Sequence, residues 1–328
     1  MTAAIVGTGF MARTHAEALA RIGVLVAGVV GSRTVEYAHT YDSFDEMLDD
    51  PRVDIVHICS PNHMHFEQAM ACLQAGKHVV CEKPLAMSSS QAHMLSAAAT
   101  ELGLVNAVCF LSRFYPLCQE AAARSVGDVR LVTGNYLQDW LSEDTDWNWR
   151  LDPAVGGPLR VVGDIGSHWL DLVGFVTGQR VEAVMADLTT VLPVRQGSTV
   201  TTEDMAGVLL RFDGGARGVL TLSQVSPGRK NHLSFEVSGS EASLAWNSEN
   251  PDQLWTGHRS SPNQLELRSA GDYPAGHAMG YPDAFKALFR AVYDGGEYPT
   301  FEDGLEQVLI GEAIAESARL GQWATVQR

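Results

Sequence analysis

Glu82, Lys83 and Pro84 directly follow the apolar run at residues 78–81, and they are the residues that first suggest chemistry. Such a run is typical of a buried strand in a parallel sheet, and open α/β sheets bind their ligands beyond the carboxyl ends of such strands. Pro84 also restricts the backbone of the lysine before it. We therefore regard Lys83 as a candidate catalytic residue.

A second candidate pair is Asp164 and His168, which lie four positions apart. In a helix these two side chains would share one face. A carboxylate beside an imidazole fixes its tautomer and raises its proton affinity, which prepares a general base near neutral pH. Asp171 is an alternative partner for the histidine, and a buried structural pair would leave the same pattern.

A dinucleotide fingerprint, G-x-G-x-x-A, begins at Gly7 and directly follows the first apolar run. Gly7 permits a tight turn, Gly9 lets the backbone approach a pyrophosphate, and Ala12 allows close helix–strand packing. The position between a strand and a helix is the context that this motif requires. The fingerprint residues expected to bind the cofactor are Gly7, Thr8, Gly9, Phe10 and Met11.

The second apolar run, at residues 24–31, carries no acid at its end, where a carboxylate would accept from the ribose hydroxyl of NAD. Ser32, Arg33 and Thr34 stand there instead, and a guanidinium between two hydroxyls suits a 2′-phosphate. These residues favour NADP, with NAD as the alternative.

Two further segments contain candidate ligand residues. The third apolar run is followed by residues that we expect to line the cofactor crevice: Ser60, Pro61, Asn62 and His65. The alternative is that Asn62 is an ordinary helix N-cap and that the histidine is a solvated side chain in the first helical turn. Three tryptophans occur within residues 140–149, followed by Arg150. Aromatic faces suit the C–H faces of a sugar ring, whereas packing of a long loop is the alternative.

The fold class is α/β. Five apolar runs in residues 1–116 alternate with helical patterns, which predicts a Rossmann-type doubly wound parallel sheet. Residues 117–328 change to alternating segments with a hairpin signal at 213–215, typical of an open, mainly antiparallel sheet. We therefore predict a dinucleotide-binding domain at 1–116 and a substrate-binding and oligomerisation domain at 117–328, assembled through the sheet as a homodimer or homotetramer.

Composition excludes several classes of partner. The net charge of −16 argues against nucleic acid and anionic membrane surfaces, and no apolar run is long enough to span a membrane. The five cysteines form no C-x-x-C pair and no zinc-type spacing. With no secretory signal at the amino terminus, we expect a reduced, cytoplasmic protein without a metal.

Six motifs along nearly the whole chain together resemble the glucose–fructose oxidoreductase and inositol dehydrogenase family. The resemblance implies an NAD(P)-dependent oxidoreductase acting on a sugar, cyclitol or related hydroxyl or carbonyl compound. It also implies that Glu82 and Lys83 lie at the cofactor, that Lys83 contacts the substrate, and that the Lys83–Pro84 bond is often cis. The motifs span residues 7–12, 60–65, 75–86, 112–116, 147–158 and 163–172.

The resemblance leads to a mechanism with open alternatives. His168 is expected to act as general base, oriented by Asp164 or Asp171, while Lys83 stabilises the alkoxide or moves the proton itself. Trp149 and Arg150 would bind substrate, and Arg113 would bind cofactor or form an interdomain ion pair. The alternative functions are an NADPH-dependent keto-sugar reductase and a non-catalytic nucleotide-sensing regulator.

Overall fold

The computed structural model describes residues 1–35, 38–268, 271–274 and 276–328. Contacts divide the chain into two compact units. The first contains Met1–Leu111 and Tyr281–Val308, and the second contains Ser112–Gly280 and Leu309–Arg328. The sequence suggested one continuous boundary near residue 116, whereas the contacts give a discontinuous division that also falls within the last long helix.

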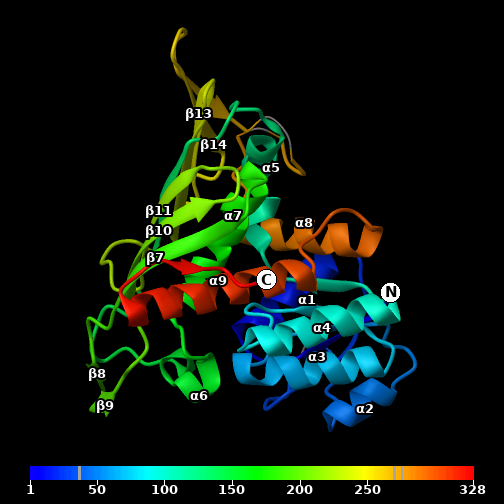
Figure 1. The fold of residues 1–328 in the computed structure, drawn as a ribbon. Helices are drawn as coiled ribbons and strands as arrows, with labels where there is room; N and C mark the ends of the chain where they lie inside the picture. The colour runs from blue at the N-terminus through cyan, green and yellow to red at the C-terminus, as the bar shows by residue number, and fades with distance from the viewer. Residues whose placement is uncertain (36–37, 269–270, 275) are drawn as a thin grey trace. The chain divides into compact units, whose positions relative to one another are not determined.

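The first unit is built on a five-stranded parallel sheet in the order β2-β1-β3-β4-β5. The central strands β1, β3 and β4 are almost entirely buried because helices cover the sheet, whereas the edge strand β2 is only partly buried (Figure 1). The predicted doubly wound parallel sheet is confirmed. The strands are β1 (Ala3–Val6), β2 (Val26–Val30), β3 (Ile55–Ile58), β4 (His78–Cys81) and β5 (Asn106–Val108).

Helices of the first unit come from both stretches of the chain. α3 packs beside α4, while α1 packs beside α8, a helix from far along the sequence (Figure 1). α4 shows why its bounds fall where they do: Ser88 accepts a hydrogen bond from the Gln91 N–H, and Gly103 ends the helix at φ +63°. The helices are α1 (Phe10–Arg21), α2 (Phe44–Asp49), η1 (Asn62–Met64), α3 (His65–Gln74), α4 (Ser89–Leu102) and α8 (Tyr281–Asp294).

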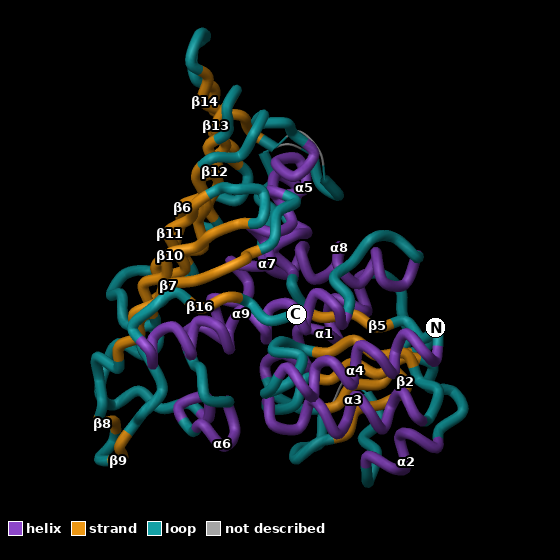
Figure 2. Tube along the Cα trace, in the orientation of Figure 1, coloured by secondary structure: helices purple, strands orange, loops and turns teal. Residues whose placement is uncertain are grey.

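The second unit contains a nine-stranded sheet in the order β15-β14-β13-β12-β6-β11-β10-β7-β16 (Figure 2). The β6–β11 pair is parallel, and the other neighbours are antiparallel, which confirms a mainly antiparallel sheet. Its strands are β6 (Leu131–Leu137), β7 (Val181–Thr189), β10 (Met205–Phe212), β11 (Arg217–Ser223), β12 (His232–Ser238), β13 (Ala242–Asn247), β14 (Gln253–His258), β15 (Gln264–Leu267) and β16 (Ala324–Thr325), with a separate hairpin of β8 (Val194–Arg195) and β9 (Ser198–Thr199).

The two faces of this larger sheet differ. Along β10 and β11 buried and exposed residues alternate. η4 packs against β11 and α7 against β6 and β12, while Leu209 and Val219 are exposed on the other face. None of the described helices is both long and apolar enough to cross a membrane. The remaining helical segments are η2 (Leu111–Phe114), α5 (Pro116–Ala123), η3 (Trp149–Leu151), α6 (Pro153–Gly156), η4 (Val162–Gly166), α7 (Ser167–Thr177) and α9 (Phe301–Leu320).

Candidate functional site

The loop between β1 and α1 has the geometry of a phosphate-binding turn. Gly7 has φ +113°, and a Cβ there would lie 2.7 Å from the Cys59 carbonyl oxygen, so only glycine fits. Gly9 is the N-cap of α1, and a Cβ on it would meet nothing within 4 Å. Ala12 is fully buried against the sheet. The turn therefore leaves open space at a helix amino terminus, which fits a pyrophosphate.

The end of β2 packs onto the same turn. A Cβ on Gly31 would lie 2.7 Å from Thr8 Cγ2, so the two strand ends meet closely. Ser32, Arg33 and Thr34 follow as exposed residues. Their position beyond the strand end agrees with a role at the adenosine ribose, but the preference for NADP is not confirmed.

His65 joins the loops that follow β3 and β4. Its Nδ1 lies 2.7 Å from the Pro84 carbonyl oxygen, and its Nε2 lies 2.9 Å from the Ser60 carbonyl oxygen. The ring is fully buried, so the solvated-histidine alternative is wrong for this residue. Burial lowers the pKa of His65, while the two carbonyl contacts act in the opposite direction. Asn62 is also buried and begins η1, next to Pro61 as its N-cap.

Lys83 follows β4 as a half-buried residue, and its peptide bond to Pro84 is cis, as the resemblance implied. Glu82 is buried, and its Oε2 accepts a hydrogen bond from the Lys83 backbone N–H at 3.2 Å. The carboxylate of one residue therefore fixes the main chain of the next.

In the second unit the structure brings Asp164 to Trp149 and Arg150, a pair that the sequence proposed from a different motif. Asp164 Oδ1 lies 3.2 Å from Arg150 Nε, and the Arg150 guanidinium lies over the Trp149 ring at 4.3 Å. Gln224, which no sequence motif marks, donates from Nε2 to Asp164 Oδ2 at 2.8 Å. Asp164 lies in the π-helical turn η4, a rare element that often occurs at functional sites.

His168 lies in the first turn of α7 and is buried. Its ring centroid is 6.3 Å from that of Tyr136, whose hydroxyl donates to Asn231 Oδ1 at 2.7 Å. Burial raises the pKa of Tyr136, and the nearby Asp164 raises it further. Tyr136 is thus a second residue of this region that no sequence motif revealed.

Arg113 and Asp171 form a two-pronged ion pair within the second unit. Arg113 Nε and Nη2 donate to the two Asp171 oxygens at 2.8 and 2.5 Å, and the guanidinium lies 5.4 Å from the Phe175 ring centroid. Both carboxylate oxygens of Asp171 therefore face the arginine. Asp164 and Asp171 were both considered as the carboxylate that orients His168. Asp171 is paired with Arg113, whereas Asp164 is bound by Gln224 and Arg150.

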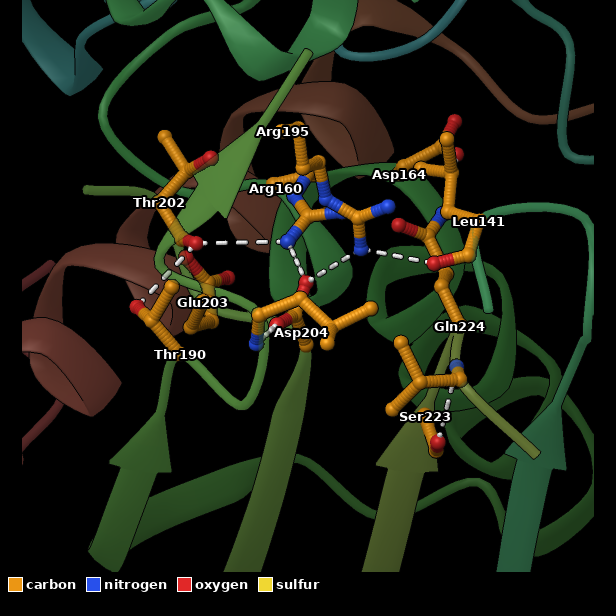
Figure 3. A network of polar contacts seen from close by, with 12 residues as sticks. Leu141, Arg160, Asp164, Thr190, Arg195, Thr202, Glu203, Asp204, Ser223 and Gln224 are labelled. Atoms are coloured by element: carbon orange, nitrogen blue, oxygen red, sulfur yellow. Dashed lines mark hydrogen bonds and ion pairs between the residues drawn. The ribbon is translucent and has the colours of Figure 1, made fainter. Parts of the chain in front are cut away.

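A buried ionic network supports the turn that carries Asp164 (Figure 3). Arg160 and Arg195, both almost fully buried, contact the same Asp204 carboxylate. The adjacent Glu203 accepts a hydrogen bond from the Val162 N–H at 3.0 Å, at the start of η4. Burial raises the pKa of Glu203. Because these residues are scattered along the sequence, only the folded chain shows the network.

His15, Glu82 and Cys109 offer three ligand-type atoms within 4.8 Å of one another. They come from α1 and from the segments after β4 and β5, so sequence spacing gave no sign of the group. His15 Nε2 and Glu82 Oε1 are hydrogen-bonded at 3.1 Å. The absence of a metal stays a prediction.

Comparisons with known proteins agree with this geometry. Residues 1–110 match the model described as oxidoreductase family, NAD-binding Rossmann fold, and residues 118–245 match the GFO/IDH/MocA C-terminal domain. Levoglucosan dehydrogenase of Pseudarthrobacter phenanthrenivorans is 28% identical over 98% of this chain and 97% of its own. The 1,5-anhydro-D-fructose reductase of Ensifer adhaerens is 30% identical over 87% of this chain and 83% of its own.

A solved structure of levoglucosan dehydrogenase with NADH and levoglucosan superposes with a TM-score of 0.92, at 27% identity and full coverage of both chains. Both halves of the chain thus match one family in the expected order. The protein belongs to the GFO/IDH/MocA family of NAD-binding oxidoreductases.

Proposed function

We propose that the protein transfers hydride between a nicotinamide dinucleotide and a hydroxyl-bearing carbon of a sugar or cyclitol. The observation that carries the proposal is the cluster around Asp164. The Asp164 carboxylate pairs with Arg150, which stacks on Trp149. Asp164 also lies in a π-helical turn directly before the helix that carries His168. The turn at Gly7 and the open space at Gly9 fit the dinucleotide. Bound there, the cofactor would accept or donate the hydride.

The residues of the chain then have separate tasks. We assign His168 as the base that takes the hydroxyl proton in oxidation and returns it in reduction. Asp164 orients the reacting hydroxyl and the imidazole, since Arg150 and Gln224 hold its carboxylate. Lys83 stabilises the developing alkoxide, and it is the alternative carrier of the proton.

A sugar or cyclitol is the substrate class that the second unit favours. The Trp149 ring and the half-exposed Trp147 offer flat apolar faces, while Arg150 and Asp164 offer a donor and an acceptor. Relatives named levoglucosan dehydrogenase and 1,5-anhydro-D-fructose reductase support this class. The five cysteines, four of them buried, are all unbridged, which is consistent with the proposed cytoplasmic location.

A substrate panel tests the proposal. Anhydrosugars, aldoses and cyclitols are offered with NAD⁺ and with NADP⁺, and the matching ketones with the reduced cofactors, while absorbance of the reduced nicotinamide is followed. We expect substrate-dependent turnover that His168→Ala removes and that His63→Ala, at an exposed histidine, leaves intact. Cofactor binding without turnover on any member would support the regulatory alternative instead.

A further inference from the structure

A chain of four polar side chains runs through the apolar interior of the first unit. Tyr293 Oη lies 3.0 Å from His57 Nε2, His57 Nδ1 lies 3.1 Å from His15 Nδ1, and His15 Nε2 lies 3.1 Å from Glu82 Oε1. These residues come from α8, β3, α1 and the segment after β4. Both imidazoles are fully buried, and His15 and His57 both lie outside the six motifs named in the sequence analysis.

The surroundings make this chain costly unless every bond is made. Phe285 and Phe289 pack on the His15 ring, with centroids at 5.4 and 4.8 Å, and Phe289 also packs on His57. A buried polar network in such surroundings is less stable than an apolar core if any member lacks a partner. The hydrogen positions must therefore form one consistent arrangement.

The chemistry of the neighbouring groups selects that arrangement. Burial lowers the pKa of His57, and the adjacent His15 lowers it further, so His57 is neutral. Burial raises the pKa of the Tyr293 hydroxyl and of the Cys59 thiol, so both keep their hydrogens. Cys59 Sγ lies 3.2 Å from His15 Nδ1, but that nitrogen has a single lone pair, so the thiol is a weaker competitor of the His57 N–H for it.

The Glu82 carboxylate can only accept, so the ring hydrogen of His15 is on Nε2 and points to Glu82, which leaves Nδ1 as the acceptor. His57 then donates from Nδ1 to His15, and Tyr293 donates to His57 Nε2. All three hydrogen bonds run in one direction, from α8 toward the Glu82 carboxylate. Among the residues that the structure describes, the other ionisable groups close enough to interact with Glu82 include Cys59, His65, Cys81 and Cys109.

Glu82 passes this constraint to the candidate catalytic lysine, because its second oxygen accepts the Lys83 backbone N–H. We propose that His15 is a positioning residue for Lys83: it holds the Glu82 carboxylate, and Tyr293 and His57 fix the tautomer in which it can do so. The consequence for turnover rests on the proposed function of Lys83, whereas the arrangement of hydrogens does not.

The tautomers are measurable by ¹⁵N NMR of the histidine rings in the full-length protein. We expect hydrogens on His15 Nε2 and His57 Nδ1 at neutral pH. Glu82→Gln should reverse the chain, because its amide N–H donates to His15 Nε2 and moves the hydrogen to Nδ1. An unprotonated His15 Nε2 in the unmodified protein, or a metal bound stoichiometrically by elemental analysis, would overturn the proposal.

The positioning role is tested with His15→Leu, which removes the donor, and His15→Gln, whose amide can replace it. His15→Leu should speed amide hydrogen exchange at Lys83 and lower kcat by as much as about a hundredfold, with a smaller change in KM. His15→Gln should restore most of both. Leu95→Ala, at a fully buried residue of α4, is the matched control: it lowers stability without changing exchange at Lys83.

These measurements distinguish a failure of the positioning role of His15 from a failure of the catalytic role of Lys83. If exchange at Lys83 and kcat are unchanged in His15→Leu, the positioning role is wrong. If Lys83→Ala is fully active, the proposed role of Lys83 in catalysis fails, while the NMR and exchange measurements still decide the relation between His15, Glu82 and Lys83.

Discussion

Gln224 and Asp164 are joined by a 2.8 Å hydrogen bond, from the Gln224 amide to Asp164 Oδ2. Gln224 is fully buried just beyond the end of β11, where its backbone N–H donates to the Asp204 carbonyl oxygen. Because the main chain of Gln224 is fixed in this way, its side chain can hold the carboxylate in one orientation. Arg150 at the other oxygen favours the ionised form of the acid.

The first prediction follows from this contact. Gln224→Glu places a like charge beside Asp164, which raises the pKa of the carboxylate pair. If ionised Asp164 is needed for turnover, the acid limb of the pH profile for kcat moves to higher pH, because activity is lost as pH falls through the raised pKa. Gln74→Glu adds the same charge at an exposed site of α3 and should leave the limb in place. An unchanged limb in Gln224→Glu would remove Asp164 ionisation from the mechanism.

The second prediction concerns cofactor choice. Ser32, Arg33 and Thr34 stand beyond β2 without an acid among them, so we expect tighter binding of NADP(H) than of NAD(H). Arg33→Ala should weaken NADP(H) binding far more than NAD(H) binding, because only NADP(H) carries the 2′-phosphate. Fluorescence titration of both reduced cofactors measures this, with Arg259→Ala as a control for the loss of one exposed charge. Tighter NAD(H) binding by the unmodified protein would show that the NADP prediction is wrong.

The third prediction is a pH dependence of stability caused by His57. Its pKa in the folded protein lies well below 6.5, whereas the unfolded chain binds a proton near that value. The unfolded state therefore binds more protons as pH falls below about 6.5, so the free energy of unfolding decreases there, by up to about 1.4 kcal/mol per pH unit for one proton.

Denaturant unfolding at several pH values measures this slope. His57→Phe removes the titrating group while keeping a ring, so its slope should be smaller than that of the unmodified protein. His65 and His78 also have lowered pKa values and remain in both proteins, so only the difference between the slopes is informative. Equal slopes would mean that His57 is already protonated in the fold.

The fourth prediction concerns assembly. Leu209 and Val219 are cross-strand partners on the open face of the large sheet, exposed by 46% and 43%. The same face is hollowed by a groove of about 650 Å³ lined by residues such as Trp255 and Leu265. Because large exposed apolar patches are rare in monomers, we expect a homodimer or homotetramer through this face.

Sedimentation at micromolar concentration distinguishes the two assemblies from a monomer. Val219→Asp should shift the protein toward smaller species, while Leu102→Asp, at an exposed residue of α4, should not. A stable monomer of the unmodified protein would contradict the prediction.

Some parts of the structure could be predicted from sequence because their signal is local. The strands β1 to β5 are short apolar runs separated by helical patterns, and the turn at Gly7 has a fixed motif next to a strand. The strands β13 and β14 were not predicted, because Trp, Gln, His and Asn interrupt their apolar alternation. β15 was also not predicted: it alternates, but over only four residues, and both of its leucines are exposed.

The candidate site was predicted only where a motif marked it. Trp149 and Arg150 were named from one motif and Asp164 from another, and the fold brings the three together. Gln224 could not have been found, because its role depends on the register that places the end of β11 beside η4. The chain from Tyr293 to Glu82 joins residues up to 236 positions apart, so no local pattern could indicate it.

The last prediction concerns Lys83 and His168. If both serve the transition state, Lys83→Ala and His168→Ala should each lower kcat by about a hundredfold or more, the usual scale for positioned acid–base groups. The turn at Gly7 is untouched in both variants, so cofactor affinity should fall much less than turnover. Since the two side chains act on one developing charge, the double variant should lose less than the product of the single losses.

A structural role for His168 predicts a different set of results. Loss of a buried, packed imidazole would lower the melting temperature, while activity per folded molecule would stay nearly intact. Turnover and thermal unfolding measured on the same samples separate these outcomes, and His63→Ala controls for the removal of an exposed histidine. Near-normal turnover of His168→Ala on a substrate that the enzyme oxidises would remove the histidine from the mechanism and favour Lys83, the alternative carrier of the proton.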